Sequence, residues 1–137
     1  MERRDFIVDE IQKFGQMVLG LIGKLVRRKQ EQQYDFSLSL ADQEFESEAG
    51  FSLRMLVGMD SDNLSAFISN HPELTPANLD LLAGLLIEIA DDPGSDSTEY
   101  LTCALRLLDK ADESDRTFSM ERQEKRMIIG QRVKGDA

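Results

Sequence analysis

The sequence predicts an all-helical protein, and three observations support this fold class. Strong helix-forming residues dominate, β-branched residues are scattered instead of clustered into strand-like runs, and only three prolines interrupt 137 residues. We expect about six helices, starting with a long N-terminal one and continuing as an array of helical hairpins. The length suits one domain over residues 1–137, since domains typically run about 100–150 residues.

The first predicted helix runs from about residue 5, where Asp5 can cap it, to about residue 30. Its glycines, Gly15, Gly20 and Gly23, each cost about 1 kcal/mol of helix propensity relative to alanine, and close approach of another helix is the ordinary reason for keeping them. Its apolar arc is wider than the roughly 100° stripe of a surface helix. The arc comprises Ile7, Val8, Ile11, Phe14, Val18, Leu19, Leu21, Ile22, Leu25 and Val26. We therefore expect neighbours on several sides of this helix.

Residues 31–70 carry weaker helical patterns. A helix over residues 31–49 is predicted from the spacing of Tyr34, Leu38, Ala41 and Phe45, with its end at Gly50. The next segment, FSLRMLVGMD, is ambiguous and compatible with a short helix. Another short helix begins at a cap, Asp60 or Ser61, and ends at the turn Asn70-His71-Pro72. Together these elements predict a second, irregular hairpin.

The pair Thr75-Pro76 is a helix start signal, an N-cap followed by proline at the first helical position. The predicted helix reaches about Asp91 and is apolar nearly all round, which marks it as central. Its apolar residues are Leu79, Leu81, Leu82, Leu85, Leu86, Ile87 and Ile89. The turn DDPGSDS separates it from a helix that begins at Ser97 and ends near residue 112.

A last helix, capped by Ser119 and ending near Arg132, has a poor apolar stripe. The stripe consists of Met120, Met127 and Ile128, with Ile129 on the far side. This pattern predicts a helix that packs loosely or serves an interface. We expect the tail, residues 134–137, to fray.

The stretch ANLDLLAGLLIEIADDPGSDSTEYLTCALRLLDKADE resembles one tetratricopeptide-type repeat in length, with Leu101 and Ala104 near the expected large and small positions. The aromatic and glycine of its first helix are out of register, and no second copy is evident. The opening DFIVDEIQKFGQMVLGLIGKLVRRK, followed by YDFSLSL, is similar to that of a group of small bacterial proteins. That resemblance implies a tetratricopeptide-like helical fold and no assigned activity.

Repeat hairpins need about three copies to cover their apolar faces, and this chain offers at most two. The missing cover must come from the first helix, from the last helix or from a second copy of the molecule. We therefore predict a non-enzymatic protein-interaction module or small scaffold that forms a homo-oligomer, a dimer, through its first helix. The alternative is a small-ligand sensor or carrier with an apolar pocket lined by Met55, Met59 and Phe67.

The formal charge of −10 is unevenly distributed: residues 1–29 carry +3, residues 30–115 carry −16 and residues 116–137 carry +3. Three interpretations compete. The acids form a solvated face, or the basic ends pack against the acidic middle within or between chains, or one surface binds a partner of opposite sign. Nucleic acid does not suit, because the basic ends are weak, mixed with acids and poor in aromatic residues.

No residue can be nominated for catalysis, cofactor binding or metal binding. Cys103 would need a histidine to activate it, and the only one, His71, lies in a turn. The DSDN at 60–63 lacks the glycine and glutamate of a calcium loop, and GQMVLGLIGK has no strand before it to make a phosphate loop. Asp91 and Asp92 lie in a polar turn, where nothing would raise a pKa for acid–base work.

The lone cysteine suits a reducing compartment. The longest apolar-rich stretch, residues 14–26, is shorter than the roughly 20 residues of a membrane span, and Arg27, Arg28 and Lys29 follow it where a secretory signal would have a cleavage site. A membrane-surface anchor is disfavoured because the same helix also carries acids on its polar face. We expect a cytoplasmic protein with no membrane span.

Overall fold

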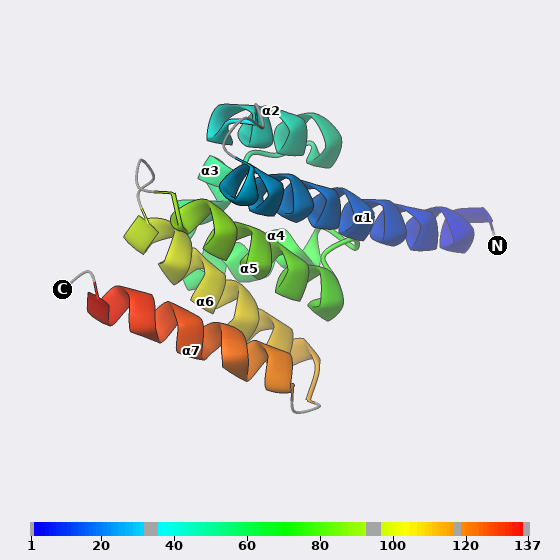
Figure 1. Cartoon of the computed structure of the whole chain (residues 1–137). Coiled ribbons are helices and arrows are strands. Elements are labelled where there is room, and N and C mark those ends of the chain that lie inside the picture. Colours follow the sequence, from blue (N-terminus) through cyan, green and yellow to red (C-terminus); the bar gives the residue numbers. More distant parts are fainter. Residues whose placement is uncertain (1, 32–35, 93–96, 117–118, 136–137) are drawn as a thin grey trace.

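The computed structural model of the chain confirms the all-helical class (Figure 1). It describes residues 2–31, 36–92, 97–116 and 119–135, and this part of the chain contains seven helices instead of about six. The additional helix is a five-residue one in the segment whose sequence pattern is ambiguous. The helices are α1 (Glu2–Gln30), α2 (Leu38–Ala49), α3 (Leu53–Val57), α4 (Ser61–Ser69), α5 (Pro76–Ala90), α6 (Ser97–Ser114) and α7 (Met120–Gly135).

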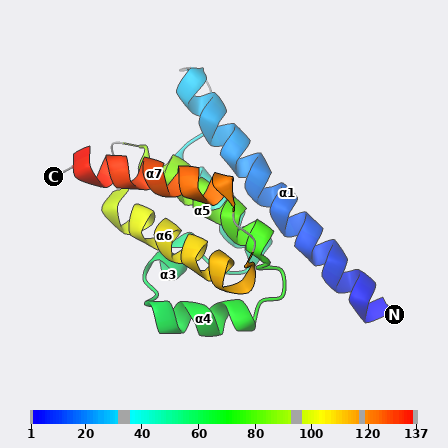
Figure 2. The same cartoon turned by 90° about the horizontal axis from the view of Figure 1, so that it is seen from below.

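Helix α5 is the central element, as its sequence predicts. Nine of its 15 residues are buried, and its antiparallel packing on α6 is the most extensive helix contact in the molecule. Helix α1 lies along a second side of α5, and α7 packs on both α5 and α6 (Figures 1 and 2). The core is continuous through α1, α2, α3, α5 and α6.

Helix α1 has neighbours on two sides along its C-terminal half, and the expectation of neighbours on several sides is wrong for its N-terminal half. Its C-terminal half packs between α2 and α5 and buries Val18, Leu21 and Leu25. Its N-terminal half extends beyond the body of the molecule (Figure 2). The side chains of Val8 and Leu19, which belong to the wide apolar arc, are 47% and 53% exposed. The helix is therefore only partly covered.

The glycines of α1 divide into two kinds. A Cβ atom on Gly15 would lie 2.8 Å from the Asn78 side-chain oxygen, so α5 does approach the helix closely at this residue. The Asn78 amide is buried there and donates to the carbonyls of Ile11 and Glu73. Gly20 and Gly23 face open space, so for these two the expected close approach of a helix is not present within the chain.

Local sequence signals place most helix ends. Thr75, Asp60 and Ser119 cap α5, α4 and α7 through the amides of Asn78, Asn63 and Arg122. Gly50 ends α2 with φ of 82°, a left-handed conformation in which glycine is not strained.

Three predicted boundaries are wrong. Helix α1 begins at Glu2, so Asp5 lies inside it and does not cap it. Helix α2 begins at Leu38 and not at residue 31, because the Ser37 hydroxyl caps it by accepting from the Leu40 amide. The predicted position of Tyr34 lies outside the described residues. Helix α7 continues through Gly135, past the expected fraying point, and residues 136–137 lie outside the described part.

A chain of ring contacts ties α1 and α2 to α4. Phe45 packs edge-on to Phe14 and Phe51, with ring centroids 6.2 and 5.3 Å apart. Phe51 in turn packs on Phe67, which stacks on His71 at 3.9 Å. These contacts connect the irregular segment of residues 45–71 to α1 through Phe14.

Candidate interaction surface

Helix α7 is attached through a buried arginine. The Arg122 side chain is only 3% exposed, and its guanidinium forms ion pairs with Asp80 at 2.8 Å, Asp115 at 3.1 Å and Asp112 at 3.2 Å. The hydrogen bond with Asp80 is the main reason why the pKa of Arg122 is raised. A single arginine on α7 thus connects α5, α6 and the residue just after α6.

Two further arginines extend this contact along α7. Arg126 pairs with Asp112 and, at 3.1 Å, with Asp109. Arg132 donates to the Ile87 carbonyl at 3.0 Å and lies 3.2 Å from Asp91. The hydrogen bond from Arg126 is the main cause of the lowered pKa of Asp112. Arginine is suited to this role because its planar fork can serve several carboxylates at once.

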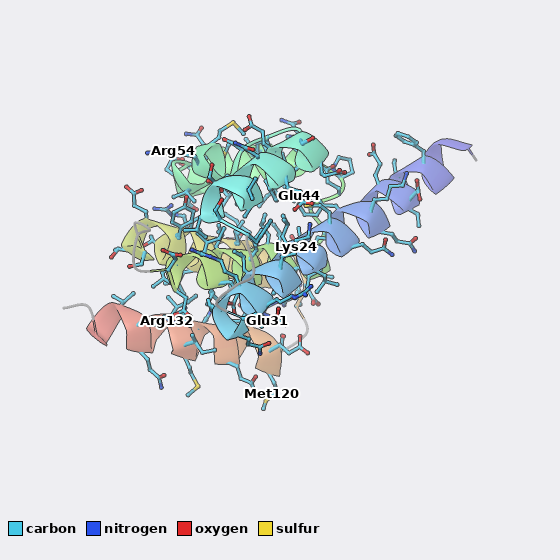
Figure 3. All side chains as sticks on the ribbon, turned by 45° about the horizontal axis from the view of Figure 1, so that its top comes forward. Lys24, Glu31, Glu44, Arg54, Met120 and Arg132 are labelled. Atoms are coloured by element: carbon cyan, nitrogen blue, oxygen red, sulfur yellow. The ribbon has the colours of Figure 1, made fainter. Side chains whose placement is uncertain are left out.

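Most of the large apolar residues of α7 are exposed to solvent and do not pack on α5 or α6. Ile129 is fully buried, but Met120 and Met127 are 66% and 64% exposed, and Ile128 and Val133 are also exposed. Figure 3 shows Met120 pointing away from the body of the molecule. Burying one isoleucine contributes about 1.5–3 kcal/mol, and an exposed ion pair contributes about 0–1 kcal/mol. Helix α7 is therefore held by its ion pairs together with one fully buried apolar side chain, and most of its exposed apolar residues take no part.

The basic end of α1 packs on acidic residues in the same way. Lys24 lies 2.7 Å from Glu44 on α2 (Figure 3), and Arg28 lies 2.6 Å from Asp92. Lys29 contacts both Glu88 at 2.5 Å and Asp91 at 2.7 Å. Of the three interpretations of the charge pattern, the structure therefore supports the second, with basic ends packed against the acidic middle inside one chain.

These cations neutralise acidic side chains at the C-terminal end of α5. Acidic side chains at a helix C-terminus are unfavourable, because the dipole places partial negative charge there. Helix α5 ends with Glu88, Asp91 and Asp92, and cations from α1 and α7 neutralise them. Hydrogen bonding to Lys29 is the largest cause of the lowered pKa of Asp91.

A notch of about 260 Å³ lies beside the projecting part of α1. Its apolar lining comes from Phe6, Phe14, Met17 and Ala49. Carboxylates surround it, from Asp9, Glu10, Glu48 and Glu73, and Lys13 is paired with Asp9 at 3.0 Å. The exposed apolar surface of α1 thus continues into an acidic, partly apolar hollow against α2.

A cavity of about 870 Å³ lies between α2, α3 and α6, and both polar and apolar residues line it. Charged residues of both signs line it: Asp42, Arg54, Asp60, Glu99 and Arg106. Burial raises the pKa of Asp42, and the nearby Arg54 partly opposes that shift. Among the three residues of the expected apolar pocket, only Met59 lines this cavity.

The other two lie elsewhere. Phe67 belongs to the ring cluster with Phe51 and His71, and Met55 is 44% exposed on α3. Met55 and Phe67 therefore do not line the cavity that Met59 lines, and the lining of that cavity is of mixed polarity. The ligand that suits such a cavity is polar or charged.

Cys103 and His71 do not meet. The Cys103 thiol is fully buried and lies 3.7 Å from the Leu56 carbonyl, and burial raises its pKa to about 12. The His71 Nδ1 atom lies 2.7 Å from the Phe67 carbonyl, which can only accept, so this nitrogen donates. At neutral pH the thiol is protonated, and a protonated thiol is a poor nucleophile.

The other candidate site residues from the sequence analysis have structural roles. Asp60 of DSDN caps α4, and Asp91 and Asp92 pair with cations. Within the described ranges, no three His, Cys, Asp or Glu side chains are grouped so that they could hold a metal ion. No helix of the part described has both the length and the apolar composition to cross a membrane.

The fold and its surfaces thus define a class, an all-helical protein whose two basic ends are bound to an acidic central hairpin. Comparison with family models, with curated proteins and with solved structures gives no match. The functional interpretation therefore depends on the geometry of this chain alone.

Proposed function

We propose that the protein is a cytoplasmic protein-interaction module on a tetratricopeptide-like helical scaffold, which forms a homodimer through α1. The observation that carries this proposal is the uncovered apolar surface of α1, where Val8 is 47% and Leu19 53% exposed. These are large apolar side chains on one helix at the edge of the fold. Burying such side chains in a second copy removes them from water, at about 1.5–3 kcal/mol for each one fully buried.

The projecting part of α1 supports the same proposal. An isolated helix of fewer than about 12–15 residues is marginal in water, and tertiary packing normally supplies its stability. The first three turns of α1 receive little packing from the chain itself (Figure 2). Val8 and Leu19 are eleven residues apart, close to three helical turns, so they share one face. That face, with Gly23 beside it in open space, would admit another helix closely.

Light scattering at micromolar concentration tests the proposal. The expected mass is twice the 15.5 kDa of one chain. The double substitution Val8→Ser and Leu19→Ser should return the protein to one chain mass, because it removes apolar surface without touching the core. Met55→Ser, on the equally exposed α3 position, is the matched control and should leave the mass unchanged. A wild-type protein that stays at 15.5 kDa at these concentrations would sink the proposal.

A second candidate function, binding of a small ligand, is favoured by the cavity of about 870 Å³. Its mixed charges, with Arg54 and Arg106 near Asp42 and Glu99, suit a ligand that bears both a cation and an anion. A thermal-shift screen with zwitterionic compounds tests it, since a ligand at about 100 times its dissociation constant stabilises by about 2.7 kcal/mol. Loss of that shift in Arg106→Gln would place the ligand in this cavity.

A further inference from the structure

Four carboxylates make one surface on the α5–α6 hairpin, which we name the acidic face: Asp80, Asp109, Asp112 and Asp115. Asp109 and Asp112 are three residues apart on α6, so their side chains project on the same side of that helix. Asp115 follows one turn later, and Asp80 comes from the adjoining α5. Each of the four accepts from an arginine of α7.

The occupant of the acidic face has a defined pattern. Arg122, Arg126 and Ile129 lie at positions i, i+4 and i+7 of α7, and Arg132 follows at i+10. These spacings place all four on one side of a helix. Ile129 is the fully buried apolar residue between the two arginine contacts on the acidic face and the Arg132 contact at the end of α5. The hairpin thus recognises a helix by charge at both ends and by one apolar side chain between them.

We propose that the acidic face is a docking site for an arginine-bearing helix of a partner protein, and that α7 is an intrachain occupant that such a helix displaces. This proposal goes beyond the dimer through α1 and does not depend on it. The partner helix would carry arginines at i and i+4, an aliphatic residue at i+7 and a cation near i+10, the pattern that α7 itself presents.

Two features of the contact favour reversible detachment of α7 from the α5–α6 hairpin. Its exposed methionines show that the apolar side of the helix is not used for attachment. The carboxylates beneath it are partly solvent-exposed already, with Asp112 at 40% and Asp115 at 38%. When α7 leaves, these carboxylates gain hydration, and among the described side chains of α7 only Ile129 is a fully buried apolar one. Departure of α5 or α6 would instead expose a large part of the apolar core.

Charge also makes the contact adjustable. The ion pairs of Arg126 and Arg132, whose side chains are 22% and 32% exposed, weaken with salt, because the screening length falls from about 10 Å at 0.1 M to about 3 Å at 1 M, whereas the pairs of the buried Arg122 are screened less. Apolar packing is not weakened in this way. High salt should therefore promote detachment of α7 and leave the packing between α5 and α6 intact.

Hydrogen exchange on the wild-type chain tests the detachment. Between 0.1 and 1 M sodium chloride, the protection of α7 amides should fall by about tenfold or more, while that of α5 amides stays within about threefold. Equal loss in both helices, or no loss in α7, would overturn the claim that α7 opens separately. This measurement needs no substitution, so it does not depend on whether a variant folds.

A binding experiment tests the docking site. The full chain with Arg122→Gln and Arg126→Gln should hold its own α7 weakly and leave the acidic face accessible. A fluorescent peptide of residues 116–137 should bind this variant at least about tenfold more tightly than it binds wild type, where the tethered α7 competes at an effective concentration near millimolar. The same peptide carrying both glutamines should not bind.

Two controls separate this proposal from the others. Arg27→Gln removes an exposed pair with Glu31 on α1 and should not open the site to the peptide. The variant with Val8→Ser and Leu19→Ser should resist the peptide as wild type does, even if it alters the mass measured by light scattering. Equal peptide affinity for wild type and for the chain with the two glutamines, or binding of the glutamine peptide, would overturn the docking site.

Discussion

The α5–α6 hairpin and the contact that holds α7 on it are stabilised by different forces. Inside the hairpin, Leu82, Leu86 and Leu107 are completely buried, and polar groups take little part. Under α7, Arg122 forms ion pairs with three carboxylates, and among the described side chains of α7 only Ile129 is apolar and fully buried.

This difference indicates that apolar burial in the α5–α6 hairpin forms the core of the fold, and that ion pairs then attach α7 to it. Apolar burial is non-directional and grows with area, so α5 and α6 can form a stable unit with many leucines. Ion pairs need geometry and weaken with screening, so they give α7 a specific seat with modest strength. The α5–α6 hairpin should therefore stay folded over a wide range of salt concentrations, whereas the attachment of α7 should depend on the salt concentration.

The largest expected effect is on the hairpin. Leu86→Ala removes a completely buried side chain from the central helix and should lower the free energy of unfolding by about 2–5 kcal/mol. Urea denaturation followed by circular dichroism measures the loss. Because the change is apolar, it should be nearly the same at 0.1 and 1 M salt. A strongly salt-dependent loss would contradict the division between the two regions.

A smaller and salt-dependent effect is expected for Arg122→Ala. It removes the buried guanidinium that serves three carboxylates, and a hydrogen bond to a charged group typically contributes about 1.5–3 kcal/mol. Urea denaturation should show a loss of about this size at low salt and a smaller one at 1 M. Lys125→Ala, a nearby basic residue of α7 that does not join this cluster, is the control.

The glycines of α1 give opposite predictions for the same substitution. Gly15→Ala would place a methyl group against Asn78, whose side chain is fixed by two hydrogen bonds, so it should destabilise by about 1–3 kcal/mol. Gly23→Ala enters open space and should stabilise by about 0.5–1 kcal/mol through helix propensity. Thermal unfolding below the micromolar range compares them in the single chain. Stabilisation by both would show that α5 does not approach α1 at Gly15.

The smallest expected effect is on pH dependence. Asp112 and Asp91 have lowered pKa values, through hydrogen bonds with Arg126 and Lys29. For a carboxyl whose pKa is lower when folded, the stabilisation is complete above its unfolded pKa of about 3.9 and is lost as pH falls through the folded value. Attachment of α7 should thus be constant from pH 7 to 5 and weaken below about pH 4. Near-constant α7 protection in hydrogen exchange between pH 5 and 3 would contradict this cause.

The regular half of the fold could be predicted from sequence because its signals are local. Thr75-Pro76 and Ser119 mark helix starts through their own capping bonds, and Gly50 marks an end through its backbone conformation. The unbroken apolar pattern around α5 required neighbours on all sides, and α6, α1 and α7 supply them.

The site could not be predicted in the same way, because a charged residue normally indicates a solvated surface. Arg122 lies nearly as deep as the leucines, and only its partners make that burial tolerable. A signal did exist: Asp109, Asp112 and Asp115 recur at intervals of three along α6 and just after it, and Arg122 and Arg126 are one turn apart on α7. Pairing two such patterns requires knowing that the helices fold back on each other.

Asp91 accepts from Lys29 of α1 and lies 3.2 Å from Arg132 of α7, so one carboxylate is shared by segments about a hundred residues apart. Two cations that divide one anion are thermodynamically linked. Loss of the Arg132 pair should therefore strengthen the Lys29 pair, and any change that strengthens the Lys29 pair should weaken the Arg132 pair by the same factor. Asp91 would in this way couple the C-terminal end of α1 to α7.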